Sequence, residues 1–158
     1  MAQHDDEFIL HALNLAEVNA QSLKGGPFGA VVVRDGQIIA EGVNQVLQDH
    51  DPTAHAEIVA LRAAGARLQQ WHLTGCTLYT SCEPCPMCLG AAYWAHVDRI
   101  VFAADRHDAA AVGFDDNALY QEFQLPTDQR RMAMERHQPE RGRAVLQGWF
   151  ALDDKVPY

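Results

Sequence analysis

Two short segments of this chain carry the residue types that chemistry needs. The first is His55-Ala56-Glu57 and the second is Pro84-Cys85-Pro86-Met87-Cys88. An imidazole and two thiolates are ligands that zinc prefers, and three protein ligands leave a fourth tetrahedral position open to water. Glu57 is then an acid–base group beside that water. The types and spacing predict one catalytic zinc ion per chain, held by His55, Cys85 and Cys88.

Both segments are expected in the first turn of a helix. Residues two positions apart on a regular helix point to nearly opposite sides, so His55 and Glu57 must lie where the chain enters the helix. Asp51-Pro52-Thr53 supplies capping residues and a proline that a helix start tolerates. Pro84 or Pro86 fits the start of the second helix. A helix N-terminus and the metal together favour thiolate over thiol.

The rest of the chain alternates between strand-like and helical segments. Helical spacing or Ala-rich apolar runs predict helices near 5–21, 53–68 and 84–95. Short apolar or alternating runs predict strands at 28–33, 37–43, 76–80 and 100–104. Asp35-Gly36 is a hairpin turn signal between the first two strands. After Gly113 the weaker pattern predicts a helix near 116–123, a strand near 132–137 and a helix near 139–152.

This alternation indicates an α/β fold in which helices cover both faces of a sheet. At 158 residues the chain is expected to be a single domain, residues 1–158. It has no apolar run of membrane-spanning length. Its acidic start lacks the pattern of a signal peptide. Four cysteines, two of them in a C-x-x-C, fit an intracellular metal site, so a cytoplasmic protein is expected.

A net charge of −9 argues against a nucleic-acid partner, because such binding depends largely on phosphate neutralisation. One group of basic residues stands apart near the C-terminus. We interpret it as a solvated surface rather than a binding patch, because Asp128, Glu135 and Glu140 are mixed into it. Its members are Arg130, Arg131, Arg136, Arg141 and Arg143.

Several motifs between Gly25 and Asp116 resemble those of a known family. They are Gly25-Gly26-Pro27-Phe28-Gly29-Ala30, Asp51-Pro52-Thr53-Ala54-His55-Ala56-Glu57, the run from Tyr79 to Ala91, Tyr93-Trp94-Ala95, Asp108-Ala109-Ala110 and Gly113-Phe114-Asp115-Asp116. The pair H-x-E and P-C-x-x-C is the established signature of zinc deaminases. The segment resembles the cytidine deaminase-fold enzymes, and within them most the small bacterial guanine deaminases. The resemblance implies a three-layer α/β/α sandwich of the cytidine deaminase type, with a central mixed sheet of about five strands.

The resemblance also implies roles for residues outside the metal site. Phe28 would pack on a purine base, Asn44 would hydrogen-bond the edge of the base, and Asp116 would accept from its N–H groups. Trp94, by its residue type, is expected either in the wall of the pocket or in the core. Glu57 would shuttle protons.

The C-terminal residue of this chain, Tyr158, matches the final Tyr of the guanine enzymes. The resemblance implies that residues 139–158 form a helix and a tail that carries Tyr158 to the active site. In this family the tail often belongs to a partner subunit, so a homodimer with exchanged tails is expected.

Some positions keep a second interpretation. Cys82 extends the motif to C-x-x-C-x-x-C, which would suit a structural zinc with four ligands or an iron–sulfur site, although His-Ala-Glu has no role in the latter. Glu83 fits a structural acceptor at a helix start better than a catalyst. Asp115 and Asp116 would both suit a helix cap, and Asn44 alone would suit a turn.

The leading hypothesis is hydrolytic deamination of guanine to xanthine and ammonia. Related alternatives are a guanine nucleoside such as guanosine, another aminopurine or an aminotriazine. Deamination of adenosine in tRNA is a further alternative, against which the acidic balance argues. A non-catalytic zinc-binding fold would not need Glu57, which is not a ligand.

Overall fold

The computed structural model describes residues 2–157. The chain divides into two compact units, and the boundary in the sequence lies between Gln121 and Glu122. The elements of the first unit are α1 (Ala2–Gln21), β1 (Gly29–Arg34), β2 (Gln37–Val43), α2 (Val46–Asp49), α3 (Ala56–Leu68), β3 (Cys76–Cys82), α4 (Pro86–Trp94), β4 (Arg99–Ala104), α5 (Arg106–Ala111) and most of α6 (Asp116–Gln124). The second unit contains the end of α6, a 3₁₀ turn (Thr127–Gln129) and α7 (Pro139–Phe150).

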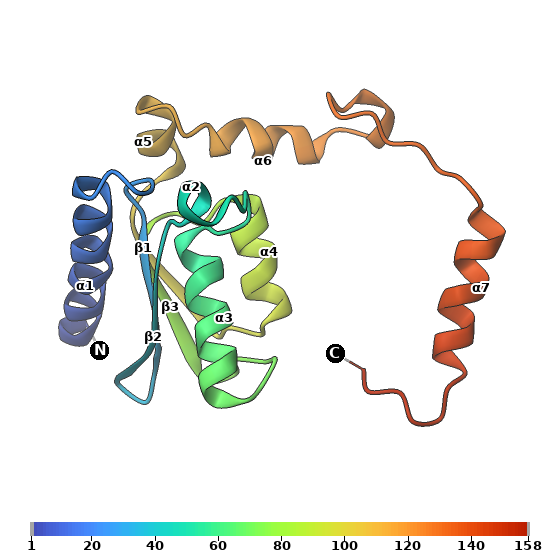
Figure 1. Ribbon diagram of the computed structural model, residues 1–158, viewed down its shortest axis with the longest axis horizontal. Helices are drawn as coiled ribbons and strands as arrows, with labels where there is room; N and C mark the ends of the chain where they lie inside the picture. The colour runs from blue at the N-terminus through green and yellow to red at the C-terminus, as the bar shows by residue number, and fades with distance from the viewer. Residues whose placement is uncertain (1, 158) are drawn as a thin grey trace. The chain divides into compact units, whose positions relative to one another are not determined.

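The first unit is built around a mixed sheet with the strand order β2-β1-β3-β4. β1 runs antiparallel to both of its neighbours, whereas β3 and β4 are parallel. Figure 1 shows α1 on one face of this sheet and α3 and α4 on the other. The three-layer α/β/α architecture is thereby confirmed. Within residues 2–157 the sheet has four strands, and the segment 132–137, for which a strand was predicted, is irregular.

Alternation along β1 divides the core between the two faces. Val32 packs with Ala60 of α3 and Leu78 of β3. Val31 and Val33 point to the opposite face, where they pack with Phe8 of α1. All three valines are at most 5% exposed. The continuous apolar run from Ala30 to Val33 is thus explained by helices on both sides, since successive side chains point to opposite faces.

Two glycines allow the helices to approach the sheet at backbone distance. A Cβ built on Gly29 would lie 2.3 Å from the carbonyl oxygen of Ala12 in α1. A Cβ on Gly42 would lie 2.2 Å from the carbonyl oxygen of Ala56, the residue between His55 and Glu57. Because no side chain fits in these spaces, Gly42 sets how closely the His-Ala-Glu segment lies on β2.

The helices that carry the two motifs begin later than the sequence predicts. α3 starts at Ala56 rather than near 53, and α4 starts at Pro86 rather than near 84. Asp51 caps a turn before the helix, because its carboxylate accepts from the Thr53 N–H at 2.8 Å and from the Thr53 hydroxyl at 2.7 Å. The short helices α2 and α5 were not predicted.

No helix within residues 2–157 combines the length and the apolar character needed to cross a bilayer.

An ion pair joins α1 to the sheet at the start of β4. The Asp5 carboxylate accepts from both Nη atoms of Arg99, at 2.9 and 2.7 Å, and from the Tyr79 hydroxyl at 2.6 Å. The hydrogen bonds from Arg99 are the main reason why the pKa of Asp5 falls from 3.8 to about 2.

We expect Asp5→Asn to lower the melting temperature at neutral pH. The folded-state pKa is depressed, so the carboxylate stabilises the fold above about pH 4, and this contribution disappears as the pH falls towards 2. Thermal melts from pH 7 to pH 2 should therefore show a difference from the unmodified protein that shrinks with acid. Asp6→Asn, at an exposed position of the same helix, is the control. A difference that does not depend on pH would contradict this explanation.

Candidate active site

The three predicted metal ligands converge at the N-termini of two adjacent helices. His55 is the N-cap residue of α3 and Cys85 is the N-cap residue of α4, both with extended backbone. Cys88 lies in the first turn of α4 and is fully buried. The His55 Nδ1 atom is 3.6 Å from the Cys85 Sγ atom. One donor atom from each of the three residues lies within 4.8 Å of the other two.

These residues fit a single zinc ion. Imidazole nitrogen and thiolate sulfur are ligands that zinc takes in tetrahedral sites, and three protein donors leave one position for another ligand. Among residues 2–157, no other group of three or more His, Cys, Asp or Glu donors is placed in this way. The Cys82 thiol is not part of the group and donates instead to the carbonyl oxygen of Asp105 at 3.7 Å. The alternative in which Cys82 is a fourth ligand is therefore not supported.

Glu57 lies beside the ligands without being one of them. Its position in the first turn of α3 follows from the extended N-cap at His55, which turns the chain into the helix between the two side chains. Only 6% of Glu57 is exposed. Burial raises the pKa of this carboxyl from 4.5 to about 7. A buried carboxyl of this kind can hold a proton or release it near neutral pH.

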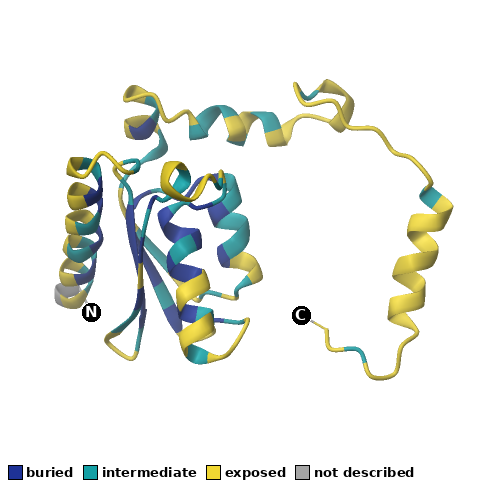
Figure 2. Cartoon of the chain, in the orientation of Figure 1, coloured by how far each residue is buried: buried dark blue, intermediate teal, exposed yellow. Residues whose placement is uncertain are grey.

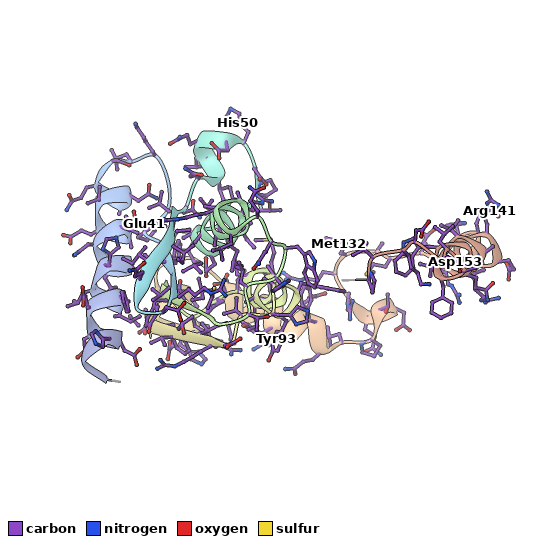
Figure 3. All side chains as sticks on the ribbon, turned by 90° about the horizontal axis from the view of Figure 1, so that it is seen from below. Glu41, His50, Tyr93, Met132, Arg141 and Asp153 are labelled. Atoms are coloured by element: carbon purple, nitrogen blue, oxygen red, sulfur yellow. The ribbon has the colours of Figure 1, made fainter. Side chains whose placement is uncertain are left out.

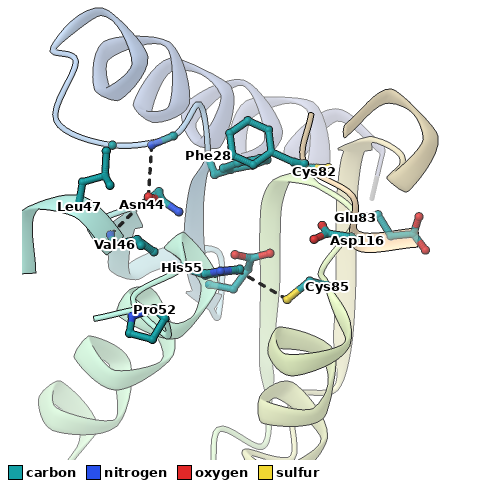
Figure 4. A pocket seen from close by; sticks show the side chains of 14 residues that line it. Phe28, Asn44, Val46, Leu47, Pro52, His55, Cys82, Glu83, Cys85 and Asp116 are labelled. Atoms are coloured by element: carbon teal, nitrogen blue, oxygen red, sulfur yellow. Dashed lines mark hydrogen bonds between the residues drawn. The ribbon is translucent and has the colours of Figure 1, made fainter. Parts of the chain in front are cut away.

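A cavity of about 370 Å³ opens beside these residues. Figure 4 shows its lining, in which Asp116 and Cys85 lie across the pocket from Asn44 and Leu47. All of the lining residues belong to the first unit. They are Gly25, Gly26, Phe28, Asn44, Val46, Leu47, Pro52, His55, Glu57, Cys82, Glu83, Cys85, Phe114 and Asp116.

Asn44 is held so that its amide group is available to the cavity. Its side-chain oxygen accepts from the N–H groups of Gly26, at 3.2 Å, and Val46, at 3.4 Å. Its main-chain oxygen accepts from the buried side chain of Asn19 on α1 at 3.0 Å. Because backbone donors occupy the side-chain oxygen, the NH₂ group is the part of Asn44 that can donate to a ligand.

Aromatic rings form one wall. Phe28 and Phe114 meet edge to face, with ring centroids 4.8 Å apart and an interplanar angle of 85°. The sequence predicted Phe28 as a pocket residue but not Phe114, although Phe114 stands inside the quoted Gly-Phe-Asp-Asp motif. The motif was the signal that could have found it.

The two adjacent aspartates have different surroundings. The Asp115 carboxylate accepts from the Ala118 N–H at 3.0 Å and so caps α6. Asp116 lines the cavity, and burial raises its pKa. The cap interpretation thus holds for Asp115, while Asp116 lies where a ligand-binding residue would have to be.

Glu83 has a structural partner. Its carboxylate accepts from the backbone N–H of Arg106 at 3.0 Å and from the Nε atom of Arg106 at 3.1 Å. These hydrogen bonds lower the pKa of Glu83. The interpretation of Glu83 as an acceptor agrees with this geometry.

Of the described residues, Trp94 was predicted in the pocket wall or the core and is not in the cavity lining. Trp94 ends α4, the helix that Cys85 starts, and 69% of it is exposed. Tyr158 lies outside the described residues. Pro52 and the α2 residues Val46 and Leu47 line the cavity without having been predicted, since a four-residue helix is too short to give a periodic pattern.

Comparisons with known proteins agree with this geometry. Residues 2–104 match the cytidine and deoxycytidylate deaminase zinc-binding region. The chain is 44% identical to the guanine deaminase of Bacillus subtilis (strain 168) over 97% of this chain and 98% of the relative. The X-ray structure of guanine deaminase from Bacillus subtilis superposes with a TM-score of 0.93, again with 44% identity and with 97% and 98% of the two chains covered. The crystal structure of NE0047 in complex with 2,6-diaminopurine has a TM-score of 0.68 and 39% identity, covering 71% of this chain and 62% of the other.

Proposed function

Because the chain belongs to the cytidine and deoxycytidylate deaminase family and is a zinc-dependent aminohydrolase, we propose that it hydrolyses guanine to xanthine and ammonia. One observation carries the proposal. Two metal ligands, the buried acid Glu57, the aromatic Phe28 and the carboxylate of Asp116 line a single cavity. The similar proteins include guanine deaminase and a protein bound to 2,6-diaminopurine, which supports a purine as the ligand of this cavity.

The reaction consumes one water, forms a C–O bond at the amino-bearing ring carbon and breaks the C–N bond. Zinc held by His55, Cys85 and Cys88 would supply the Lewis acid that activates the water. Glu57 would take a proton from the attacking water and deliver it to a ring nitrogen. It would then transfer the second proton to the departing amine, which leaves as ammonia. Burial of Glu57 keeps these transfers inside the pocket.

Other side chains would select and orient the base. Phe28 would pack against the ring face, with Phe114 behind it. The NH₂ group of Asn44 would donate to an acceptor on the base. Asp116 would accept from neighbouring N–H groups, because a carboxylate offers two oxygens to a pair of parallel donors.

We expect Asp116→Ala to lower kcat/KM for guanine by about 10–100-fold, the range for losing one or two hydrogen bonds to a charged group. Adenine lacks the same pair of donors, so the ratio of guanine to adenine turnover should fall. Steady-state kinetics with both bases measures this ratio. Asp115→Ala is the matched control, because it removes the adjacent carboxylate, which bonds to the backbone of α6 and is not in the cavity lining. Equal losses for both bases in Asp116→Ala would contradict the assigned role.

The test of the proposed function is ammonia release from a panel of substrates. Purified, zinc-loaded protein would be assayed with guanine, guanosine, cytosine, cytidine, adenine and an adenosine-containing tRNA loop. We expect guanine to give the highest kcat/KM. Preference for guanosine would move the proposal to a nucleoside, and preference for the tRNA loop would replace it. The net charge of −9 argues against the tRNA substrate.

We also propose that the protein is a homodimer whose C-terminal helix and tail, residues 139–158, exchange between subunits. Figure 2 shows α7 almost wholly exposed. Leu146 and Phe150 on this helix are each 72% exposed and lie one turn apart. Exposed apolar residues on one face of a helix are typical of a protein–protein interface. The polar residue Arg141 of the same helix is also exposed (Figure 3). The exchanged tail would carry Tyr158 to the site of the partner. The four cysteines form no disulfide among residues 2–157, which supports a cytoplasmic location.

We expect deletion of Val156-Pro157-Tyr158 to leave the zinc content and melting temperature nearly unchanged and to lower kcat/KM at least about tenfold, because the site loses an aromatic cover that keeps water out. Mixing this truncated chain with full-length Glu57→Gln would show whether tails cross. If they do, the mixed dimer regains activity that neither parent has. A truncated chain with full activity would show that Tyr158 has no part in the site.

A further inference from the structure

Three segments meet on the side of the cavity where the metal-ligand loop enters α4. The loop after β3 contains Glu83 and Pro84, the loop after β4 leads into Arg106, and α6 contributes Tyr120. The backbone of Glu83 donates to the carbonyl oxygen of Ala104 at 2.8 Å, so the two loops are adjacent. None of these residues is a metal ligand, and the chemistry proposed above does not use Arg106 or Tyr120.

The contacts among these residues form a continuous chain. Arg106 is ion-paired with Glu83 through side-chain and backbone hydrogen bonds. The Arg106 guanidinium lies over the ring of Tyr120, with 3.7 Å from its central carbon to the ring centroid. The Tyr120 hydroxyl donates to the main-chain oxygen of Pro84 at 2.7 Å. We call Glu83, Pro84, Arg106 and Tyr120 the clamp.

The environment of the clamp favours a defined geometry. Pro84 is buried, and the side chains of Arg106 and Glu83 are only 29% and 17% exposed. Ion pairs and cation–π contacts are stronger when water is partly excluded. The Tyr120 hydroxyl supplies a buried carbonyl group with a hydrogen bond, which such groups need. The clamp therefore joins α6 to the residue immediately before the ligand Cys85.

Helix geometry connects the clamp to Asp116. Asp116 is the first residue of α6 and Tyr120 follows one turn later, so the two side chains lie on the same face of the helix. Asp116 lines the cavity and Tyr120 is anchored to Pro84. The Asp115 cap and the Phe114–Phe28 contact hold the chain just before Asp116, and the Tyr120 hydrogen bond holds the helix one turn after it.

We infer that Tyr120 is a positioning residue: through its hydrogen bond to Pro84 and its stacking on the Arg106–Glu83 pair, it sets the position of Asp116 relative to the metal ligands. This inference rests on the proposed function only in assigning Asp116 to the substrate. The clamp would therefore influence which base binds, although Tyr120 lies one helical turn away from Asp116, the residue proposed to contact the base.

The test is a double-mutant cycle between Tyr120→Phe and Asp116→Ala in the zinc-loaded, full-length protein. Tyr120→Phe removes only the hydroxyl and keeps a ring under Arg106. We expect KM for guanine to rise about three- to tenfold, as for the loss of one hydrogen bond. Zinc content should stay unchanged, and the melting temperature should fall by only a few degrees, because one buried carbonyl loses its donor. In the Asp116→Ala background the same change should have almost no further effect, because a residue that acts through Asp116 cannot act without it.

Amide hydrogen exchange supplies a readout that does not depend on catalysis. Tyr120→Phe should speed exchange in residues 117–121 of α6 and leave α3 unchanged. Tyr93→Phe, which alters an exposed tyrosine of α4 (Figure 3), is the matched control. Faster exchange in α6 together with no guanine turnover by the unmodified protein would overturn the proposed function and leave the clamp in place. Normal KM and normal exchange in Tyr120→Phe, or additive losses in the cycle, would overturn the clamp.

Discussion

We expect Glu57→Gln to abolish nearly all guanine turnover while the protein still binds one zinc ion. Acid–base assistance is worth roughly 10²–10⁴-fold for one positioned group, and here a single carboxyl would serve several proton transfers, so the loss in kcat should reach the upper end of that range or exceed it. Glutamine has nearly the same shape and cannot take up or release a proton. Zinc should be retained, because Glu57 is not among the three ligands.

Steady-state kinetics and elemental analysis of the same preparation measure this outcome. Glu7→Gln, at an exposed position of α1, controls for the loss of one acidic group. Near-normal turnover in a zinc-replete Glu57→Gln protein would show that another group moves the protons.

A second large effect is expected from Cys88→Ala. Cys88 is fully buried and supplies one of three donors, so its removal should lower the zinc content of the purified protein well below one per chain and eliminate activity. Stability should fall as well, because an ion that binds only the folded state adds about 4 kcal/mol to the free energy of unfolding when its free concentration is about a thousand times its Kd.

Cys82→Ala is the matched control for this experiment. It removes a thiol from the same C-x-x-C-x-x-C sequence, yet Cys82 bonds to a carbonyl oxygen and is outside the ligand group. We expect this variant to keep its zinc. If Cys82→Ala loses zinc as completely as Cys88→Ala does, the three-ligand assignment is wrong.

The metal centre could be predicted from the sequence because each of its two motifs, His55-Ala56-Glu57 and Cys85-Pro86-Met87-Cys88, is a local pattern of ligand types. The alternation of strands and helices is also a local pattern, and it predicted the layers of the fold correctly. The predicted turn at Asp35-Gly36 is confirmed, with φ of 51° and 73° at its two residues. The helix starts were misplaced because the true N-caps, His55 and Cys85, make no side-chain cap bond and so leave no capping signal.

Long-range contacts explain what the sequence could not show. The stacking of Arg106 on Tyr120 and the support of Asn44 by Asn19 join residues from different elements, and no local pattern marks them. The segment 132–137, for which a strand was predicted, is irregular, because strand formation depends on pairing with another strand and a local sequence pattern does not specify that partner. Asn44 and Asp116 became candidates only through the family resemblance, and their positions in the lining agree with it.

Hydrolysis of guanine in H₂¹⁸O tests the central claim most directly. Zinc-loaded protein and Glu57→Gln protein would be incubated with guanine in labelled water, and the products would be analysed by mass spectrometry with a parallel ammonia assay. The account predicts xanthine that carries one ¹⁸O atom, ammonia in equal amount, and almost no product from the variant. Unchanged guanine with the unmodified, zinc-loaded protein, or xanthine without the label, would contradict it.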